Sequence, residues 1–176
     1  HFNIIKTNTV VIKGVNDDEV IDIINHMKNF KSEIRFIEYM DVGESNKWDP
    51  SKVVSSESLL ESINEHYSLK QMKTETSSTA KKWHIKDSNS SIGLISSITQ
   101  PFCSSCNRAR LSVDGKLFTC LFASNGFDIK SVIRSDDYEE KLLEFFKKIW
   151  MERSDQYSQI RFSSKRDLPK VEMSYI

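Results

Sequence analysis

The first forty residues alternate strand-like and helix-like patterns, and this order constrains the fold more than any other feature of the chain. Residues 3–12 are rich in isoleucine, valine and threonine, which predicts a buried strand. Residues 20–30 place apolar side chains at helical spacing, after Asn16 and Glu19 in the pattern of a capping box. Residues 34–40, "IRFIEYM", predict a second strand. This strand–helix–strand order predicts two parallel strands and an α/β fold.

The remaining pattern suggests two regions. The loop over residues 40–48 follows the second strand, and ligands collect beyond the C-terminal ends of parallel strands, so it is a candidate binding loop. We assign residues 1–68 to an α/β region and residues 69–176 to a small α+β region. The other predicted elements are helices over 56–67 and 137–153, a polar linker over 70–79, and strands in "AKKWHI" and "IGLISSI". The stretch from Ser154 onward is polar, and we predict no firm structure for it.

Composition excludes several functional classes. Charged residues are 28% and hydrophobic residues 38%, which is typical of a soluble globular protein. The net charge is zero, so nothing indicates a nucleic-acid partner. No apolar run approaches the roughly 20 residues that span a bilayer, and no signal peptide is visible. The chain opens at His1 inside a strand-like stretch, which favours a fragment of a longer protein.

Three cysteines lie in one short segment, "CSSCNRARLSVDGKLFTC": Cys103, Cys106 and Cys120. Their odd number and close spacing argue against a disulfide framework and for a reducing compartment, so we expect a cytoplasmic protein. Asp114-Gly115 between two β-type runs predicts a tight hairpin. With these two residues as the loop, Cys120 falls opposite Ala109. The return places it near Cys106, so the three sulfurs can converge.

The segment allows three interpretations. Three separate buried cysteines are the simplest, because cysteine often packs as a small hydrophobic residue. A structural zinc site needs a fourth ligand, for which His84 is the only candidate in this region. An iron–sulfur cluster held by three thiolates leaves one iron without a protein ligand, open to a substrate.

Arg108 and Arg110 follow Cys106 at once. They could simply occupy the solvent face of a strand. Beside an open metal site, two guanidinium groups also suit a phosphate or a carboxylate. In a two-residue hairpin, however, Ala109 and Cys120 share a face and the two arginines point to the other. Either a bulge rotates the strand, or the arginines reach the site from its far wall.

The segment "FCSSCNRARLSVDGKLFTCLFA" resembles the C-terminal cluster motif of the GTP 3',8-cyclases, the radical S-adenosylmethionine enzymes of molybdenum cofactor biosynthesis. "KTNTVVIKGVNDDE" and "RFIEYMDVGESNKW" resemble two further blocks of that family, in the same order, so the resemblance covers nearly the whole chain. It implies that residues 1–68 are the C-terminal part of an incomplete (β/α) radical S-adenosylmethionine barrel. Residues 69–176 would then bind the cluster and GTP.

The resemblance also implies roles for particular residues. Cys103, Cys106 and Cys120 would ligate a [4Fe–4S] cluster whose open iron meets the guanine of GTP. Arg108, Ala109 and Arg110 would line the GTP site.

Three further positions carry weaker expectations. Lys6, in "KTN", would contact GTP, although it could be an ordinary lysine at a strand end. Met40 would contact the adenine of S-adenosylmethionine, although it could be a core methionine. Arg35, if it faces the barrel interior, needs an anionic partner.

Two departures from the family pattern are visible. The C-x-x-x-C-x-x-C motif that holds the family's first [4Fe–4S] cluster, which cleaves S-adenosylmethionine, does not occur here, and the chain ends at Tyr175-Ile176 without the family's Gly-Gly tail. We therefore expect the chain alone to be inactive. The resemblance further implies a cyclic pyranopterin monophosphate synthase as the downstream partner, and it leaves a homodimer open. The alternative is a non-catalytic zinc-binding module.

Overall fold

The computed structural model describes residues 2–163, 168–172 and 175, and the chain divides into two compact units. The first unit consists of His1–Met40 and Trp48–Ser105. The second consists of Asp41–Lys47 and Cys106–Ile176. The segment Asp41–Lys47 thus groups with the C-terminal part of the chain, although the residues on both sides of it belong to the first unit.

The first unit is built on a five-stranded sheet, whose strands are β1 (Ile5–Val11), β2 (Ser32–Glu38), β3 (Leu69–Gln71), β4 (Lys81–Ile85) and β5 (Ser91–Ile95). Their order in the sheet is β1-β2-β5-β4-β3. β2 is parallel to both β1 and β5, whereas β4 is antiparallel to both β5 and β3. The predicted parallel pair and the α/β class are therefore confirmed, while the partial barrel stays a prediction.

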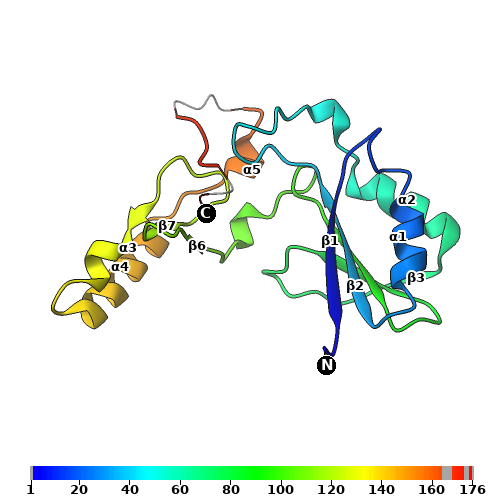
Figure 1. Cartoon of the computed structure of the whole chain (residues 1–176), viewed down its shortest axis with the longest axis horizontal. Helices are drawn as coiled ribbons and strands as arrows, with labels where there is room; N and C mark the ends of the chain where they lie inside the picture. Colours follow the sequence, from blue (N-terminus) through cyan, green and yellow to red (C-terminus); the bar gives the residue numbers. More distant parts are fainter. Residues whose placement is uncertain (1, 164–167, 173–174, 176) are drawn as a thin grey trace. The chain divides into compact units, whose positions relative to one another are not determined.

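Two helices, α1 (Val20–Met27) and α2 (Ser56–His66), cover one face of this sheet (Figure 1). Successive side chains of a strand point to opposite faces, and in β2 the fully buried Ile34 and Phe36 point toward the helices. They pack with Ile24 of α1 and with apolar side chains of α2. Full burial of one such side chain contributes about 1.5–3 kcal/mol. Single turns of 3-10 helix lie at η1 (Pro50–Lys52) and η2 (Cys103–Ser105).

The start of α1 differs from the prediction. The helix begins at Val20 after Glu19, so the expected capping box at Asn16 is wrong. The side chain of Asn16 closes the turn after β1 instead: its Oδ1 accepts from the Ile12 N–H at 2.8 Å, and its Nδ2 donates to the Val10 carbonyl at 3.0 Å. An asparagine side chain can stabilise either a turn or a helix start, and here the turn uses it.

The second unit contains a small antiparallel sheet in the order β6-β7-β8, with β6 at Arg110–Leu111, β7 at Lys116–Phe118 and β8 at Phe127–Asp128. Its helices are α3 (Ile129–Ile133), α4 (Tyr138–Met151) and α5 (Tyr157–Ile160). α3 and α4 pack against one another (Figure 1). The helix predicted over residues 137–153 is thus confirmed, while α5 lies in a stretch for which the sequence predicted no structure.

The strands β3, β4 and β5 belong to the same sheet as β1 and β2, whereas the sequence analysis placed them in the second region. β5 pairs in parallel with β2, and four of its five residues are buried. Leu69–Gln71 forms β3 at the edge of the sheet, so the linker predicted over residues 70–79 is wrong at its first two residues. The proposed functional division between residues 1–68 and residues 69–176 stays a prediction.

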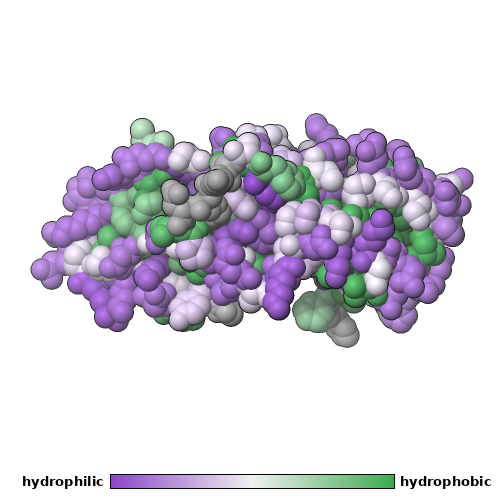
Figure 2. Space-filling model, turned by 90° about the horizontal axis from the view of Figure 1, so that it is seen from above, coloured by the Kyte–Doolittle hydropathy of each residue, from purple (hydrophilic) through white to green (hydrophobic). Residues whose placement is uncertain are grey.

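The face of the molecule shown in Figure 2 is mainly polar. Hydrophilic residues cover most of the face seen in Figure 2, in keeping with 28% charged residues. In the described part of the chain, no helix combines the length and the apolar character that crossing a membrane requires.

Candidate functional site

The hairpin between β6 and β7 has a three-residue loop rather than the predicted two-residue loop. Arg110 pairs with Phe118, and the Ser112 N–H donates to the Lys116 carbonyl at 2.9 Å. Gly115 closes the loop with φ of +84°, a conformation that favours glycine and that a bulged three-residue loop requires.

This change in register decides on which face of the strand the side chains of Arg108 and Arg110 lie. A shift of one residue moves every side chain of a strand to its other face. Continued back along the chain, the register places Arg108 opposite Cys120, so the predicted pairing of Ala109 with Cys120 is wrong. Arg108 and Arg110 are partly buried, whereas Ala109 is exposed. The bulge, one of the two alternatives left open by the sequence, thus brings both arginines to the cysteine face.

Cys106 lies among cationic groups of the same unit. The Nη2 of Arg108 donates to the Cys106 sulfur at 3.1 Å. Burial raises the pKa of the Cys106 thiol, but a hydrogen bond from Arg153 and the charges of Arg108 and Arg153 outweigh it, so the pKa lies below its usual range. The guanidinium of Arg110 is within electrostatic range of both Cys106 and Cys120. Because the thiolate is the form that binds metals, these surroundings suit metal ligands.

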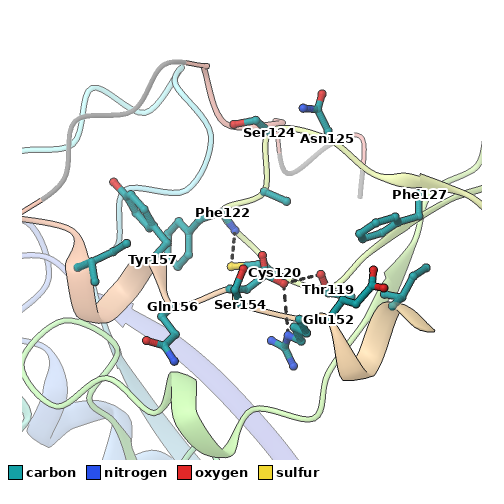
Figure 3. Close-up of a pocket in the computed structure, with 15 residues that line it drawn as sticks. Thr119, Cys120, Phe122, Ser124, Asn125, Phe127, Glu152, Ser154, Gln156 and Tyr157 are labelled. Atoms are coloured by element: carbon teal, nitrogen blue, oxygen red, sulfur yellow. Dashed lines mark hydrogen bonds and ion pairs between the residues drawn. The ribbon is translucent and has the colours of Figure 1, made fainter. Parts of the chain in front are cut away.

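Cys120 lies in the wall of a cavity of about 460 Å³ within the second unit (Figure 3). The Phe122 N–H points toward the Cys120 sulfur at 3.4 Å, and the ring of Phe122 lies 4.9 Å, centroid to centroid, from that of Tyr157. The volume falls in the range of about 300–1,000 Å³ that is typical of small-ligand sites. The sulfur therefore borders a space that could admit a ligand.

Cys103 belongs to η2 of the first unit, whereas Cys106 and Cys120 belong to the second. Over residues 2–163, 168–172 and 175, no group of three or more histidine, cysteine, aspartate and glutamate side chains could hold a metal ion. The convergence of the three sulfurs therefore stays a prediction. His84, the candidate fourth zinc ligand, lies on β4 opposite Ser91 of β5.

A charged cluster lies on the sheet face opposite the helices, around the buried Glu33. Its carboxylate is 2.6 Å from Arg35 Nε, 3.0 Å from Lys82 Nζ and 3.9 Å from Lys6 Nζ. Burial raises the pKa of Glu33, but hydrogen bonds and charge from Lys82 and Arg35 outweigh it and lower the pKa. Arg35 thus has the anionic partner that its position requires. Three cations surround one carboxylate, so this cluster carries a net positive charge.

Met40 follows β2 and is partly buried. Just before it, Glu38 is fully buried, and its carboxylate accepts hydrogen bonds from the N–H groups of Ser56, Ile98 and Thr99, each at 2.8 Å. The Thr99 hydroxyl adds a fourth at 2.6 Å. Glu38 therefore ties the C-terminal end of β2 to the first residue of α2 and to the segment after β5. The sequence analysis did not identify it.

The candidate binding loop belongs to the second unit, where Asp41 anchors its start. The buried Asp41 carboxylate accepts from Tyr157 Oη at 2.7 Å, from Arg161 Nε at 2.8 Å and from Lys170 Nζ at 2.8 Å. Burial raises the pKa of Asp41, but the hydrogen bonds from Lys170 and Tyr157 and the charges of Arg161 and Lys170 outweigh it and lower the pKa. An ionised carboxylate thus links the loop to the C-terminal residues.

Glu172 holds the middle of the same loop. Its carboxylate accepts from the backbone N–H groups of Glu44 at 2.8 Å and Ser45 at 3.0 Å, and from the Ser45 hydroxyl at 2.9 Å. Gly43 has φ of +66°, and a Cβ at this position would lie 2.3 Å from Glu172 Oε2. Glycine is therefore needed for the backbone conformation and for the close approach of the carboxylate.

We expect Glu172→Ala to loosen the loop without unfolding the second unit. Three hydrogen bonds to the segment would be lost, so amide hydrogens of Glu44 and Ser45 should exchange several-fold faster. Hydrogen exchange read by mass spectrometry over residues 41–47 checks this, with Glu140→Ala, an exposed change on α4, as the control. Equal exchange in the two variants would show that Glu172 does not hold the loop.

Comparisons with known proteins identify the family. A family described as Molybdenum Cofactor Synthesis C matches residues 32–159, which include β2, the β6–β7 hairpin, all three cysteines and α4. The chain therefore belongs to this family of molybdenum cofactor synthesis proteins.

Curated relatives narrow the likeness to particular enzymes. GTP 3',8-cyclases of Staphylococcus aureus strains JH9, Newman and Mu3 are each 44% identical to this chain over 177 residues. The alignment covers 98% of this chain and 52% of each relative. The chain thus spans about half the length of the curated relatives it matches.

Proposed function

We propose that this chain is the GTP-binding half of a GTP 3',8-cyclase, which converts GTP to (8S)-3',8-cyclo-7,8-dihydroguanosine 5'-triphosphate in the first step of molybdenum cofactor biosynthesis. The observation that carries the proposal is the positive charge at the hairpin cysteines: Arg108 donates to the Cys106 sulfur, and Arg110 lies within electrostatic range of Cys106 and Cys120. Cationic groups next to thiol ligands suit an anionic nucleotide that meets a metal cluster. Identity to the Staphylococcus aureus cyclases supports this assignment.

The donor chemistry fits a [4Fe–4S] cluster. Cys106 and Cys120 both lie within electrostatic range of the Arg110 guanidinium. The positive charges around Cys106 favour its thiolate form. With Cys103 as the third ligand, a cluster bound here would supply one iron with an open coordination position for guanine. The role of this chain is to hold the sulfurs in place and to set positive charge beside them.

The binding residues act by orientation and electrostatics. Arg108 and Arg110, with the backbone at Ala109, are proposed to line the GTP site, the guanidinium groups meeting phosphate oxygens. Lys6 is proposed as another GTP contact. Its side chain is 50% exposed and stands 3.9 Å from Glu33, so the ammonium group is accessible to an anion.

Radical generation requires parts that these residues do not supply. The three cysteines contain no C-x-x-x-C-x-x-C spacing, so a first cluster that cleaves S-adenosylmethionine would be held elsewhere in the protein. Met40 is the proposed contact to the adenine of S-adenosylmethionine. The product would pass to a cyclic pyranopterin monophosphate synthase. A cytoplasmic location and a homodimer stay predictions.

Arg110→Ala is expected to weaken GTP binding by about tenfold or more, because a hydrogen bond to a charged group contributes roughly 1.5–3 kcal/mol. Arg108→Ala should act in the same direction. Isothermal titration of GTP into the anaerobically reconstituted protein measures the effect, with Arg134→Ala on the exposed end of α3 as the control. Iron and sulfide contents are determined in the same samples, because both arginines also lie near cysteine sulfurs. Unchanged GTP titration curves would remove these arginines from the site.

A further inference from the structure

The side chain of Arg153 connects the segment that carries Cys106 to the end of α4. Arg153 follows the last turn of this helix, and only 10% of its side chain is exposed. Its Nη1 donates to the Cys106 carbonyl at 2.5 Å, and its guanidinium lies 5.0 Å from the ring centroid of Trp150. The aromatic ring and the carbonyl together fix the plane of the guanidinium group.

Asp155 extends this connection to the strand end that carries Cys120. Its Oδ2 accepts from Arg153 Nε at 3.3 Å and from the Thr119 hydroxyl at 2.5 Å. Thr119 is buried and directly precedes Cys120. One chain of hydrogen bonds, Cys106–Arg153–Asp155–Thr119, thus joins the backbones next to two cysteines that are 14 positions apart in the sequence.

The two charges of this chain of contacts are also placed where they act on the sulfurs. The positively charged guanidinium of Arg153 donates to the Cys106 carbonyl, and the negatively charged carboxylate of Asp155 accepts from Thr119, the residue before Cys120. Partly buried charges are screened less than charges in water, so each retains an effect on a nearby group.

We propose that Arg153 is a positioning residue for the iron–sulfur cluster, and that with Asp155 it fixes the separation of Cys106 and Cys120 and tunes the cluster electrostatically. This inference rests on the proposed function, in which the two cysteines ligate a [4Fe–4S] cluster. Outer groups that orient metal ligands typically change metal affinity by about 10–100-fold when removed. Charge and hydrogen bonding near a cluster set its reduction potential.

The test uses two variants of opposite charge effect, Arg153→Gln and Asp155→Asn. Both break the connection, so both should lower the affinity for reconstituted iron and sulfide by about 10–100-fold. Their potentials should move in opposite directions: Arg153→Gln removes a positive charge and makes the potential more negative, whereas Asp155→Asn removes a negative charge and makes it more positive. Anaerobic reconstitution followed by iron and sulfide analysis and redox titration monitored by electron paramagnetic resonance provides both readouts.

Lys147→Gln is the matched control, since it removes an exposed cation from the same helix, and it should leave both readouts unchanged. Arg153→Lys keeps the charge but not the planar fork, so it should preserve the potential better than the affinity. Should Arg153→Gln fail to fold, Asp155→Asn and Arg153→Lys still test the affinity and the potential.

The outcomes separate this inference from the function on which it rests. A wild-type chain that takes up no iron and sulfide overturns both. A wild-type chain that binds a cluster, with unchanged affinity in Arg153→Gln and Asp155→Asn, overturns the positioning role alone. Potentials that shift in the same direction in both variants overturn the electrostatic role, because a general disturbance of the fold would produce that result.

Discussion

Replacing Cys103 with serine is expected to abolish assembly of the iron–sulfur cluster. A serine hydroxyl remains protonated at neutral pH and is a poor substitute for a thiolate, so two sulfur ligands would be left where three are needed. After anaerobic reconstitution with iron and sulfide, we expect the wild-type chain to contain roughly four iron and four sulfide ions per chain and the variant to contain little of either. Visible absorbance of the cluster provides a second measurement on the same samples.

Ser104→Ala is the matched control, because it changes the neighbouring exposed residue without touching a sulfur. Retention of the cluster absorbance by Cys103→Ser would contradict the three-cysteine assignment. Zinc without iron or sulfide in the anaerobically purified wild-type chain would favour the zinc-binding module instead.

The β6–β7 hairpin illustrates how much of the site could be predicted from the sequence. Asp114-Gly115 correctly indicated the turn between the two strands. The sequence could not decide between a two-residue and a three-residue loop, since both accept Asp-Gly. That single residue determines whether Arg108 and Arg110 face Cys120 or point away from it. Local turn chemistry is therefore predictable here, but the register is set by packing of the whole hairpin.

The sheet of the first unit shows a similar limit. Periodicity found β1, α1, β2 and α2, because each has a strong apolar pattern over several residues. It also found β4 and β5 as strands, but it did not predict that they join the sheet of β1 and β2. Strand pairing over a long connection depends on which apolar faces fit together, and β5 joins β2 across more than fifty residues of chain. Short-range patterns contain no information about such a pairing.

The buried carboxylates were the features that could be predicted least from the sequence. Glu33, Glu38 and Asp41 each stand in or just after β2, where the sequence alone reads as an ordinary strand followed by a loop. Their partners come from distant segments, such as Lys82 for Glu33 and Lys170 for Asp41. A burial pattern in which nearly every residue of β2 is covered, polar ones included, is visible only once the sheet is assembled.

Glu38 gives the prediction with the largest expected effect on stability. The fully buried carboxylate of Glu38 accepts four hydrogen bonds, three from backbone N–H groups and one from a hydroxyl. Glu38→Gln keeps the size but points an NH₂ group at N–H or O–H donors, which leaves buried donors unsatisfied. Each such loss costs about 1–3 kcal/mol, so we expect the free energy of unfolding of the first unit to fall by about 3–5 kcal/mol. The melting temperature of this unit should fall by about 12–40 °C.

Glu57→Gln is the matched control for this stability measurement. Glu57 lies in the first turn of the same helix that Glu38 contacts, but its side chain is exposed, so its replacement should change stability by less than about 0.5 kcal/mol. Circular dichroism during thermal and urea unfolding distinguishes the two variants. If Glu38→Gln melted with the wild-type protein, the four hydrogen bonds would not hold the end of β2 to α2. The position of Met40, directly beyond that strand end, would then have to be fixed by other contacts.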